Sequence, residues 1–160
     1  MLRLIVMRHA KSDWDAGVMD DHGRPLNDRG RREAPIVGQK LVELGAAPDY
    51  VVSSDATRTR ETYERLATVL PKVPVRFARE LYHAGLLAVR ALAPSLPREA
   101  TTVMVLGHNP GWQEMVSELS GEDVEMKTAY AAVLESEAAD FTRALERGAR
   151  MRLVTVVAPR

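Results

Sequence analysis

The chain has 160 residues, enough to bury a sizeable core, and we expect a single domain spanning residues 1–160. Basic and acidic residues both number 22, so the net charge is zero and neither nucleic-acid nor anionic-membrane binding is favoured. Cysteine is absent, which excludes disulfides, thiolate nucleophiles and cysteine-based metal sites. Because no signal-peptide pattern or membrane-spanning run occurs, we expect a cytoplasmic protein.

The first half of the chain alternates between strand and helix patterns. An apolar run over residues 2–6 predicts a strand, and a polar loop follows over residues 12–24. The sequence NDRGRREAPIVGQKLVELG predicts a helix, with Asn27 or Asp28 as its N-cap and Gly45 at its end. Its apolar positions recur at spacings of three and four residues, as on one helical face: Ala34, Val37, Leu41 and Leu44.

The middle of the chain repeats this alternation. A strand is predicted over residues 50–52, followed by a helix in ATRTRETYERLATVL, which carries Tyr63, Leu66 and Leu70 on one side. A shorter strand is predicted over residues 73–77, and a helix in LLAVRALAPSL that breaks near Pro94.

The second half begins with an uninterrupted apolar strand over residues 101–106, typical of a parallel strand buried on both faces. A helix follows in NPGWQEMVSELSG, with Pro110 in its first turn and Gly121 at its end. Further strands are predicted over 129–134 and 151–157, separated by a charged, partly helical segment. This alternation predicts an α/β fold: a three-layer sandwich with a mostly parallel sheet and helices on both faces.

Charged and polar residues follow the predicted strands at the places where each strand ends. Arg8, His9 and Lys11 follow the first strand, Ser54 and then Arg58 follow the second, and His108 and Asn109 follow the strand over 101–106. Because ligands of open α/β sheets bind beyond the carboxyl ends of the strands, we expect two histidines and two arginines at one rim.

Two arginines and a helix start are well suited to a phosphate group. Arginine presents a planar fork of donors that matches phosphate oxygens, and a helix N-terminus adds free backbone N–H groups. A neutral imidazole can attack phosphorus, because its ordinary pKa lies near 6.5. Neighbouring arginines disfavour the protonated ring, so Arg8 would help to keep His9 available as a nucleophile.

Other kinds of site are less well supported. Each motif alone has an ordinary explanation as a surface pair, a turn or a charged helix face, and only their coincidence at one rim favours a site. The four histidines lack the spacing of an H-E-x-x-H zinc motif, and Arg8 beside His9 would repel a cation. No strand is followed by G-x-G-x-x-G or by G-x-x-x-x-G-K-[ST].

These motifs resemble those of the histidine phosphatase superfamily, which includes phosphoglycerate mutases. The segment VMRHAKSDW resembles the R-H-G signature of the family, and the segment SSDATRTRET resembles its S-x-x-x-R-x-x-x-T signature. The segment VLGHNPG resembles the region of the second catalytic histidine. The segment GRPLNDRGRREA is similar to the one that leads into the first long helix of the family. The match extends over most of residues 1–120. RHAKSDW, RPLNDRGRREAP, LYHAG and GHNPG further resemble the SixA-type phosphohistidine phosphatases.

The resemblance implies a histidine phosphatase-like fold and a hydrolase that needs no metal or other cofactor. His9 would be the transiently phosphorylated nucleophile, and Arg8, Arg58 and His108 would bind the phosphoryl oxygens. We expect Lys11, Ser54, His83 and Asn109 to contact the substrate, with Lys11 beside the acidic loop 13–21 at the pocket mouth. The partner would be a phosphorylated protein or a small phosphorylated metabolite; the oligomeric state is open.

Two positions depart from the family pattern. Ala10 stands where the first signature has glycine, and LYH stands where ester-cleaving relatives carry an acidic residue in L-R-E. His83 thus takes the position of the general acid, with Glu80 three residues earlier. An alkoxide leaves poorly without a proton donor, whereas the imidazole of a phosphohistidine leaves more readily.

This departure favours protein phosphohistidine as the substrate, although a protonated His83 could itself donate. A small-molecule phosphomonoesterase is the alternative at the same site. A phospho-ligand-binding protein without activity would not need His9.

Overall fold

The computed structural model describes residues 1–160 and contains one six-stranded sheet with the strand order β3-β2-β4-β1-β5-β6. The strands are β1 (Leu2–Arg8), β2 (Tyr50–Ser54), β3 (Val75–Ala78), β4 (Thr102–Gly107), β5 (Ala131–Ser136) and β6 (Arg152–Val157). Neighbours among β3, β2, β4 and β1 pair in parallel, whereas β5 is antiparallel to both β1 and β6. The predicted mostly parallel sheet is confirmed.

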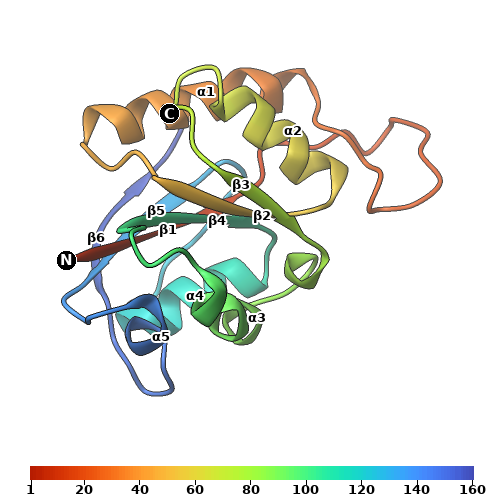
Figure 1. Ribbon diagram of the computed structural model, residues 1–160. Coiled ribbons are helices and arrows are strands. Elements are labelled where there is room, and N and C mark those ends of the chain that lie inside the picture. The colour runs from red at the N-terminus through yellow and green to blue at the C-terminus, as the bar shows by residue number, and fades with distance from the viewer.

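Helices cover both faces of this sheet, as predicted (Figure 1). On one face lie α1 (Asp28–Glu43) and α2 (Thr57–Leu66), and on the other lie α3 (Leu86–Leu92), α4 (Gly111–Ser120) and the short α5 (Phe141–Ala144). Alternate residues of β1 serve the two cores: Leu4 and Val6 pack on the α3–α5 side, Ile5 and Met7 on the α1–α2 side. This alternation is the period of two of a strand buried on both faces.

Local sequence signals explain where several helices begin and end. Asn27 is the N-cap of α1, because its side-chain oxygen accepts the backbone N–H of Gly30 at 2.9 Å. Gly121 ends α4 with φ of +73°, a left-handed conformation that glycine adopts without strain. None of the helices combines the length and apolar character that crossing a bilayer requires.

Some predicted boundaries differ from those observed. The helix α2 ends at Leu66, so Leu70 joins the same core from the turn that follows. Leu44 is exposed instead of completing the apolar face of α1, because the helix ends one residue earlier and Leu44 is its C-cap. The charged segment after β5 contributes only the single turn α5.

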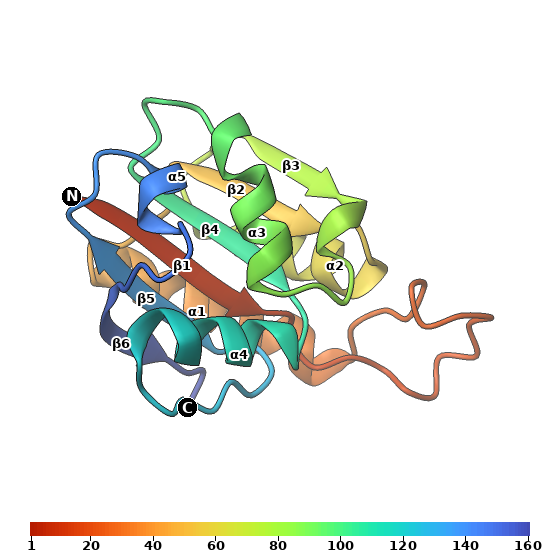
Figure 2. The same cartoon turned by 90° about the horizontal axis from the view of Figure 1, so that it is seen from below.

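The parallel strands end level with one another, which positions the candidate site. Arg8 at the end of β1 is paired with Gly107 at the end of β4, and Ser53 near the end of β2 is paired with Leu106. Residues that leave these three strands therefore emerge side by side at the carboxyl edge of the sheet (Figure 2).

Candidate active site

The strand ends bring together the histidines and arginines that the sequence placed at one rim. The rings of His9 and His108 have centroids 5.4 Å apart, although 99 positions separate them in the chain. Arg58, the second residue of α2, brings its Nε to 3.4 Å from His9 Nε2. Each of these three side chains is buried.

The hydrogen bonds of His9 determine which ring nitrogen is free. Nδ1 lies 2.7 Å from the carbonyl oxygen of Ala10, and a carbonyl only accepts, so Nδ1 carries the proton. The lone pair is then on Nε2, the atom that faces Arg58. The following backbone is held by Thr62, whose hydroxyl accepts the N–H of Ala10 at 3.0 Å.

Burial and positive charge keep the His9 ring neutral. Burial lowers its pKa to about 3, with Arg58, Arg8 and Arg24 contributing in the same direction and the Ala10 hydrogen bond opposing them. At neutral pH the ring therefore presents an unprotonated nitrogen. This is the state a nucleophile needs.

His108 is a second buried imidazole held in a fixed orientation. Its Nε2 is hydrogen-bonded to Ser54 Oγ at 2.8 Å, and that hydroxyl also accepts the N–H of Ala56 at 3.3 Å. Ser54 therefore orients His108. Burial, followed by the influence of His9, Arg58 and His83, lowers the pKa of His108 to about 2. Its Nδ1 is buried and has no protein partner, which leaves one ring nitrogen for a ligand.

Arg8 and Asn109 share one backbone carbonyl next to the site. Arg8 Nη1 donates to the carbonyl of Met126 at 3.2 Å, and Asn109 Nδ2 donates to the same oxygen at 2.7 Å. Asn109 Oδ1 also accepts the N–H of Gln113 at 3.2 Å, so the Asn109 amide is used in fixing this loop. Arg8 Nε is buried without a partner, and burial together with Arg58 lowers the Arg8 pKa.

Lys11 is a predicted substrate contact whose side chain forms no hydrogen bond at the site. Its backbone carbonyl accepts the N–H of Asn27 at 3.0 Å, which ties the chain after His9 to the start of α1. Its side chain is partly exposed and forms no hydrogen bond with the cluster. Its place at the mouth stays a prediction.

Asp21 links most of the site, a role that sequence reasoning missed because it treated this residue only as the end of the acidic loop 13–21. Its Oδ2 accepts the Tyr82 hydroxyl at 2.6 Å and an N–H of Arg58 at 2.9 Å, and its Oδ1 accepts an N–H of Arg24 at 2.8 Å. Burial would raise the pKa of Asp21, but hydrogen bonds from Tyr82, Arg24, His83 and Arg58 outweigh it and hold the pKa well below its ordinary value.

Nothing in the sequence marks Asp21, which lies in an irregular polar loop away from any strand end. Arg24 carried more signal, since the segment GRPLNDRG was among the motifs that resemble the family. Tyr82 also stands next to His83 in LYH. Burial raises the Tyr82 pKa, as do its hydrogen bond to Asp21 and that residue's charge.

His83 reaches the site through an unusual backbone conformation. Its φ is +52°, in the left-handed region that few residues other than glycine adopt. Its ring centroid lies 5.1 Å from that of His108, and its Nε2 donates to Asp21 Oδ2 at 2.9 Å. Glu80, the other candidate proton donor, instead forms an exposed ion pair with Arg76 at 3.7 Å.

The assembled site is suited to a phosphoryl group. It combines a neutral nitrogen nucleophile with guanidinium donors and a second imidazole that has an unpaired nitrogen. Guanidinium groups stabilise charge on phosphoryl oxygens as it develops in the transition state. No group of three His, Asp or Glu side chains is arranged to hold a metal ion.

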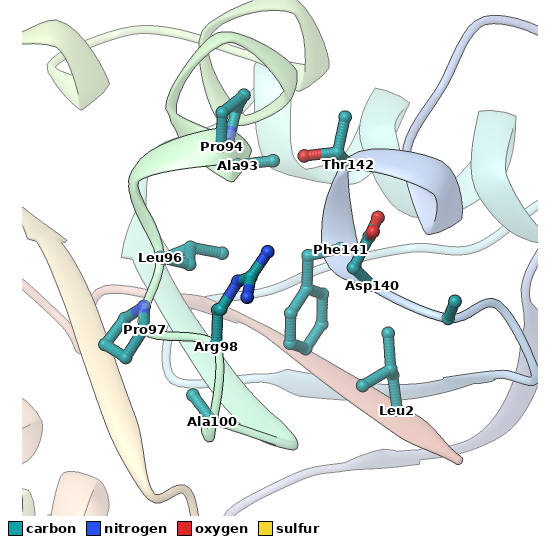
Figure 3. A pocket seen from close by; sticks show the side chains of 11 residues that line it. Leu2, Ala93, Pro94, Leu96, Pro97, Arg98, Ala100, Asp140, Phe141 and Thr142 are labelled. Atoms are coloured by element: carbon teal, nitrogen blue, oxygen red, sulfur yellow. The ribbon is translucent and has the colours of Figure 1, made fainter.

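A different pocket lies at the opposite end of the sheet (Figure 3). It has a volume of about 230 Å³ and is lined mainly by apolar and small residues at the start of β1, after α3 and around α5: Leu2, Ala93, Pro94, Leu96, Pro97, Arg98, Ala100, Ala139, Asp140, Phe141 and Thr142. It contains no histidine, and its one arginine and one carboxylate lie at exposed positions.

Known proteins share the sequence profile of this chain and its fold. The profile of the histidine phosphatase superfamily (branch 1) matches residues 4–94, which include His9 and Arg58. The chain belongs to the histidine phosphatase superfamily. It is an enzyme of that superfamily, and the relationship supports phosphatase activity.

Individual relatives and solved structures extend this comparison. The structure resembles the candidate phosphohistidine phosphatases SixA of Nakamurella multipartitia (30% identity, TM-score 0.84, 99% of this chain and 96% of that one) and Agrobacterium tumefaciens (28%, 0.82, 99% of each). A chloroplastic protein of Arabidopsis thaliana without an assigned function is 38% identical over 144 residues, 84% of this chain. The chain spans 66% of the length of that plant relative.

Proposed function

We propose that this histidine phosphatase hydrolyses protein phosphohistidine through a phosphorylated His9 intermediate. The observation that carries the proposal is the state of the His9 ring. Nδ1 is fixed as a donor to Ala10, so the neutral ring directs its free Nε2 toward the guanidinium of Arg58. The nucleophile and the group that would stabilise the phosphoryl oxygens are therefore already next to each other.

Two displacements at phosphorus complete the reaction. In the first, His9 Nε2 forms a bond to phosphorus while the bond to the leaving group breaks, and the leaving imidazole takes a proton from solvent. In the second, a water oxygen attacks phosphorus and loses a proton to solvent, the electron pair of the His9–phosphorus bond returns to Nε2, and phosphate is released. Arg8, Arg58 and His108 stabilise the phosphoryl oxygens in both steps.

The leaving group distinguishes phosphohistidine from an ester substrate. Asp21 is the carboxyl group hydrogen-bonded to Arg58, and its pKa is held well below its ordinary value, so it is a poor proton donor. An imidazole leaving group needs less proton donation than an alkoxide, which supports the phosphohistidine assignment. A small-molecule phosphomonoesterase is the second candidate, and the hydrogen-bonded His83 is the residue that would serve it as an acid.

The test begins with trapping the intermediate. Wild-type protein incubated with ³²P-labelled phosphohistidine protein should yield an acid-labile, base-stable label, and His9→Ala should yield none. His9→Ala should lose turnover entirely but still bind vanadate, because the arginines and His108 remain. Equal turnover of the two proteins would overturn the covalent mechanism. Values of kcat/KM for phosphohistidine protein, sugar phosphates and a nucleotide would then rank the substrate classes.

A further inference from the structure

The loop between β1 and α1 projects from the carboxyl edge of the sheet, away from the body of the molecule (Figures 1 and 2). We call residues 13–23 of this loop the arm. Every residue from Trp14 to Asp20 is exposed, and none of them lies in a helix or strand. The outer part of the arm therefore stabilises the fold little through burial.

The base of the arm is tied to the candidate active site through Asp21 and His22, and its two ends are bonded to each other. Asp21 accepts an N–H of Arg58, and His22 Nε2 is hydrogen-bonded at 2.8 Å to Asp55, which directly follows β2. The N–H of Asp13 donates to the carbonyl of Pro25 at 2.8 Å. These contacts fix the base of the arm at the edge of the site, and the outer part extends outward from there.

The outer part carries large apolar side chains that the protein leaves in water. Trp14 is 73% exposed, Val18 is 44% exposed and Met19 is fully exposed, all within six residues. Single exposed apolar residues are common, but a group of them marks a surface that another molecule covers. Tryptophan often anchors protein interfaces, and methionine adapts its shape to a partner.

Trp14 is also held in a fixed position. The guanidinium carbon of Arg24 lies 3.5 Å from the centre of the Trp14 ring, and Arg24 is itself bonded to Asp21 and Ser12. The exposed indole is thereby connected to the site through two side chains. A partner that contacts Trp14 would lie beside Arg24 and Asp21, at the edge of the candidate active site.

The charges of the arm indicate what its partner would carry. Asp13, Asp15 and Asp20 form no ion pair with any basic residue of the chain. A matching surface would therefore be apolar and edged with lysine or arginine. A free phosphorylated metabolite could not contact the site and the exposed tip of the arm together, whereas a folded protein could.

We propose that the arm is the docking surface for a folded protein phosphorylated on histidine, with apolar and basic residues around its phosphohistidine. This inference rests on the proposed function. In it, Trp14, Val18 and Met19 bind the protein surface while the phosphoryl group enters between His9 and Arg58. The arm then selects protein substrates without taking part in the chemistry.

The first experiment compares two substrates with the same leaving group: a phosphocarrier protein phosphorylated on histidine and the free amino acid phosphohistidine. The double variant Val18→Ser/Met19→Ser should reduce kcat/KM for the protein by about tenfold or more, mainly through KM, and leave free phosphohistidine within about twofold. Leu44→Ser is the matched control, since Leu44 is 56% exposed at the far end of α1, and it should change neither substrate.

Equal losses on both substrates, or no loss on either, would overturn the docking role. If the wild type hydrolyses free phosphohistidine but not the protein, the protein-substrate assignment fails and the docking inference fails with it. If the wild type hydrolyses neither substrate, the proposed phosphatase function itself fails. If the wild type sediments as a dimer and the double variant as a monomer, the arm binds a second copy, and the inference is wrong.

A second measurement needs no change in the arm. Mild peroxide should oxidise Met19 readily in His9→Ala, because the side chain is fully exposed. Saturating phosphorylated protein should slow that oxidation several-fold, whereas free phosphohistidine should not. Met1, which is 56% exposed, provides the internal control within the same sample. Unchanged oxidation of Met19 in the complex would contradict docking on the arm.

Discussion

The two ends of the sheet differ in the polarity of their side chains. At the carboxyl end, buried polar side chains hold one another: Ser54 holds His108, and Thr62 holds the backbone after His9. At the opposite end, Leu2 and Phe141 line a largely apolar pocket. Because burying polar groups costs stability unless they are bonded, a folded chain concentrates them where their chemistry is needed. We therefore expect the carboxyl end of the sheet to serve function and the opposite end to serve stability.

The largest loss that sharpens this comparison is expected from Arg58→Lys. Lysine keeps the positive charge but loses the planar fork that reaches Asp21 and faces His9. We expect kcat/KM for phosphohistidine to fall by about ten- to a thousandfold, with little change in Tm. Steady-state kinetics and thermal unfolding would check this. A fully active variant would show that burial of Arg58 serves the fold instead.

The residues that directly follow the strands are those whose positions the sequence predicted. Arg8, His9, Ser54 and His108 leave three parallel strands, and the topology rule for such sheets brings these exits together. The helix α1 and its cap were likewise legible from local pattern, since Asn27 caps a helix whose apolar residues recur at helical spacing.

The contacts made by irregular segments could not be predicted from the sequence. Asp21 reaches Arg58 from a loop with no periodic pattern. His83 reaches Asp21 through a backbone with positive φ, which no local sequence signal indicates. Ser54 and Asn109, which we expect to contact substrate, also form side-chain hydrogen bonds within the protein, which the sequence did not indicate. Their contact with substrate stays a prediction. A residue type at a strand end predicts where it lies better than what it bonds.

A smaller effect is expected from His83→Ala. If the substrate's imidazole leaves without a strong acid, phosphohistidine hydrolysis should change by less than about tenfold, below the ~100-fold expected for a lost general acid. Aryl phosphates should behave similarly, and sugar phosphates should be poor substrates of both proteins. A matched Tyr82→Phe variant also removes a hydrogen bond to Asp21 but leaves the His83 ring in place. It therefore separates the loss of a contact with Asp21 from the loss of proton donation by His83.

The pH profile, measured in the same experiment, tests whether His9 titrates. With its pKa near 3, His9 stays neutral throughout pH 5 to 8, so protonation of the nucleophile cannot produce an acid limb in that range. Suppose that sugar phosphates are the best substrates of the wild type and that their turnover collapses in His83→Ala. His83 would then be the general acid. The protein would then be a metabolite phosphatase.

A modest gain in affinity is expected from Asp21→Asn. The Asp21 carboxylate lies 2.9 Å from Arg58 Nη2, so an incoming oxyanion competes with it for the guanidinium and is repelled by its charge. Removing that charge at constant size should strengthen vanadate binding by about three- to tenfold. Isothermal titration at pH 7 would measure this. Asp20→Asn is the control, because Asp20 is exposed and bonds only the N–H of Gly23. Weaker vanadate binding would mean that Asp21 positions Arg58 and does not compete with the ligand.

The smallest effect on activity is expected from Phe141→Ala, at the opposite end of the sheet. Phe141 is buried in the core between α5 and the sheet and lines the apolar pocket, so its removal leaves a cavity there. Phenylalanine-to-alanine changes in cores cost about 3–5 kcal/mol, which corresponds to a Tm lower by roughly 10 °C in a chain of this size. Below the unfolding transition, kcat/KM for phosphohistidine should stay within about twofold, since the Arg58–His9 contact and the Thr62–Ala10 bond lie at the other end of the sheet. Thermal unfolding and kinetics on one preparation would measure both quantities. A fall in kcat/KM as large as that of Arg58→Lys would mean that the sheet transmits packing changes from one end to the other, and the separation of stability from function would not hold.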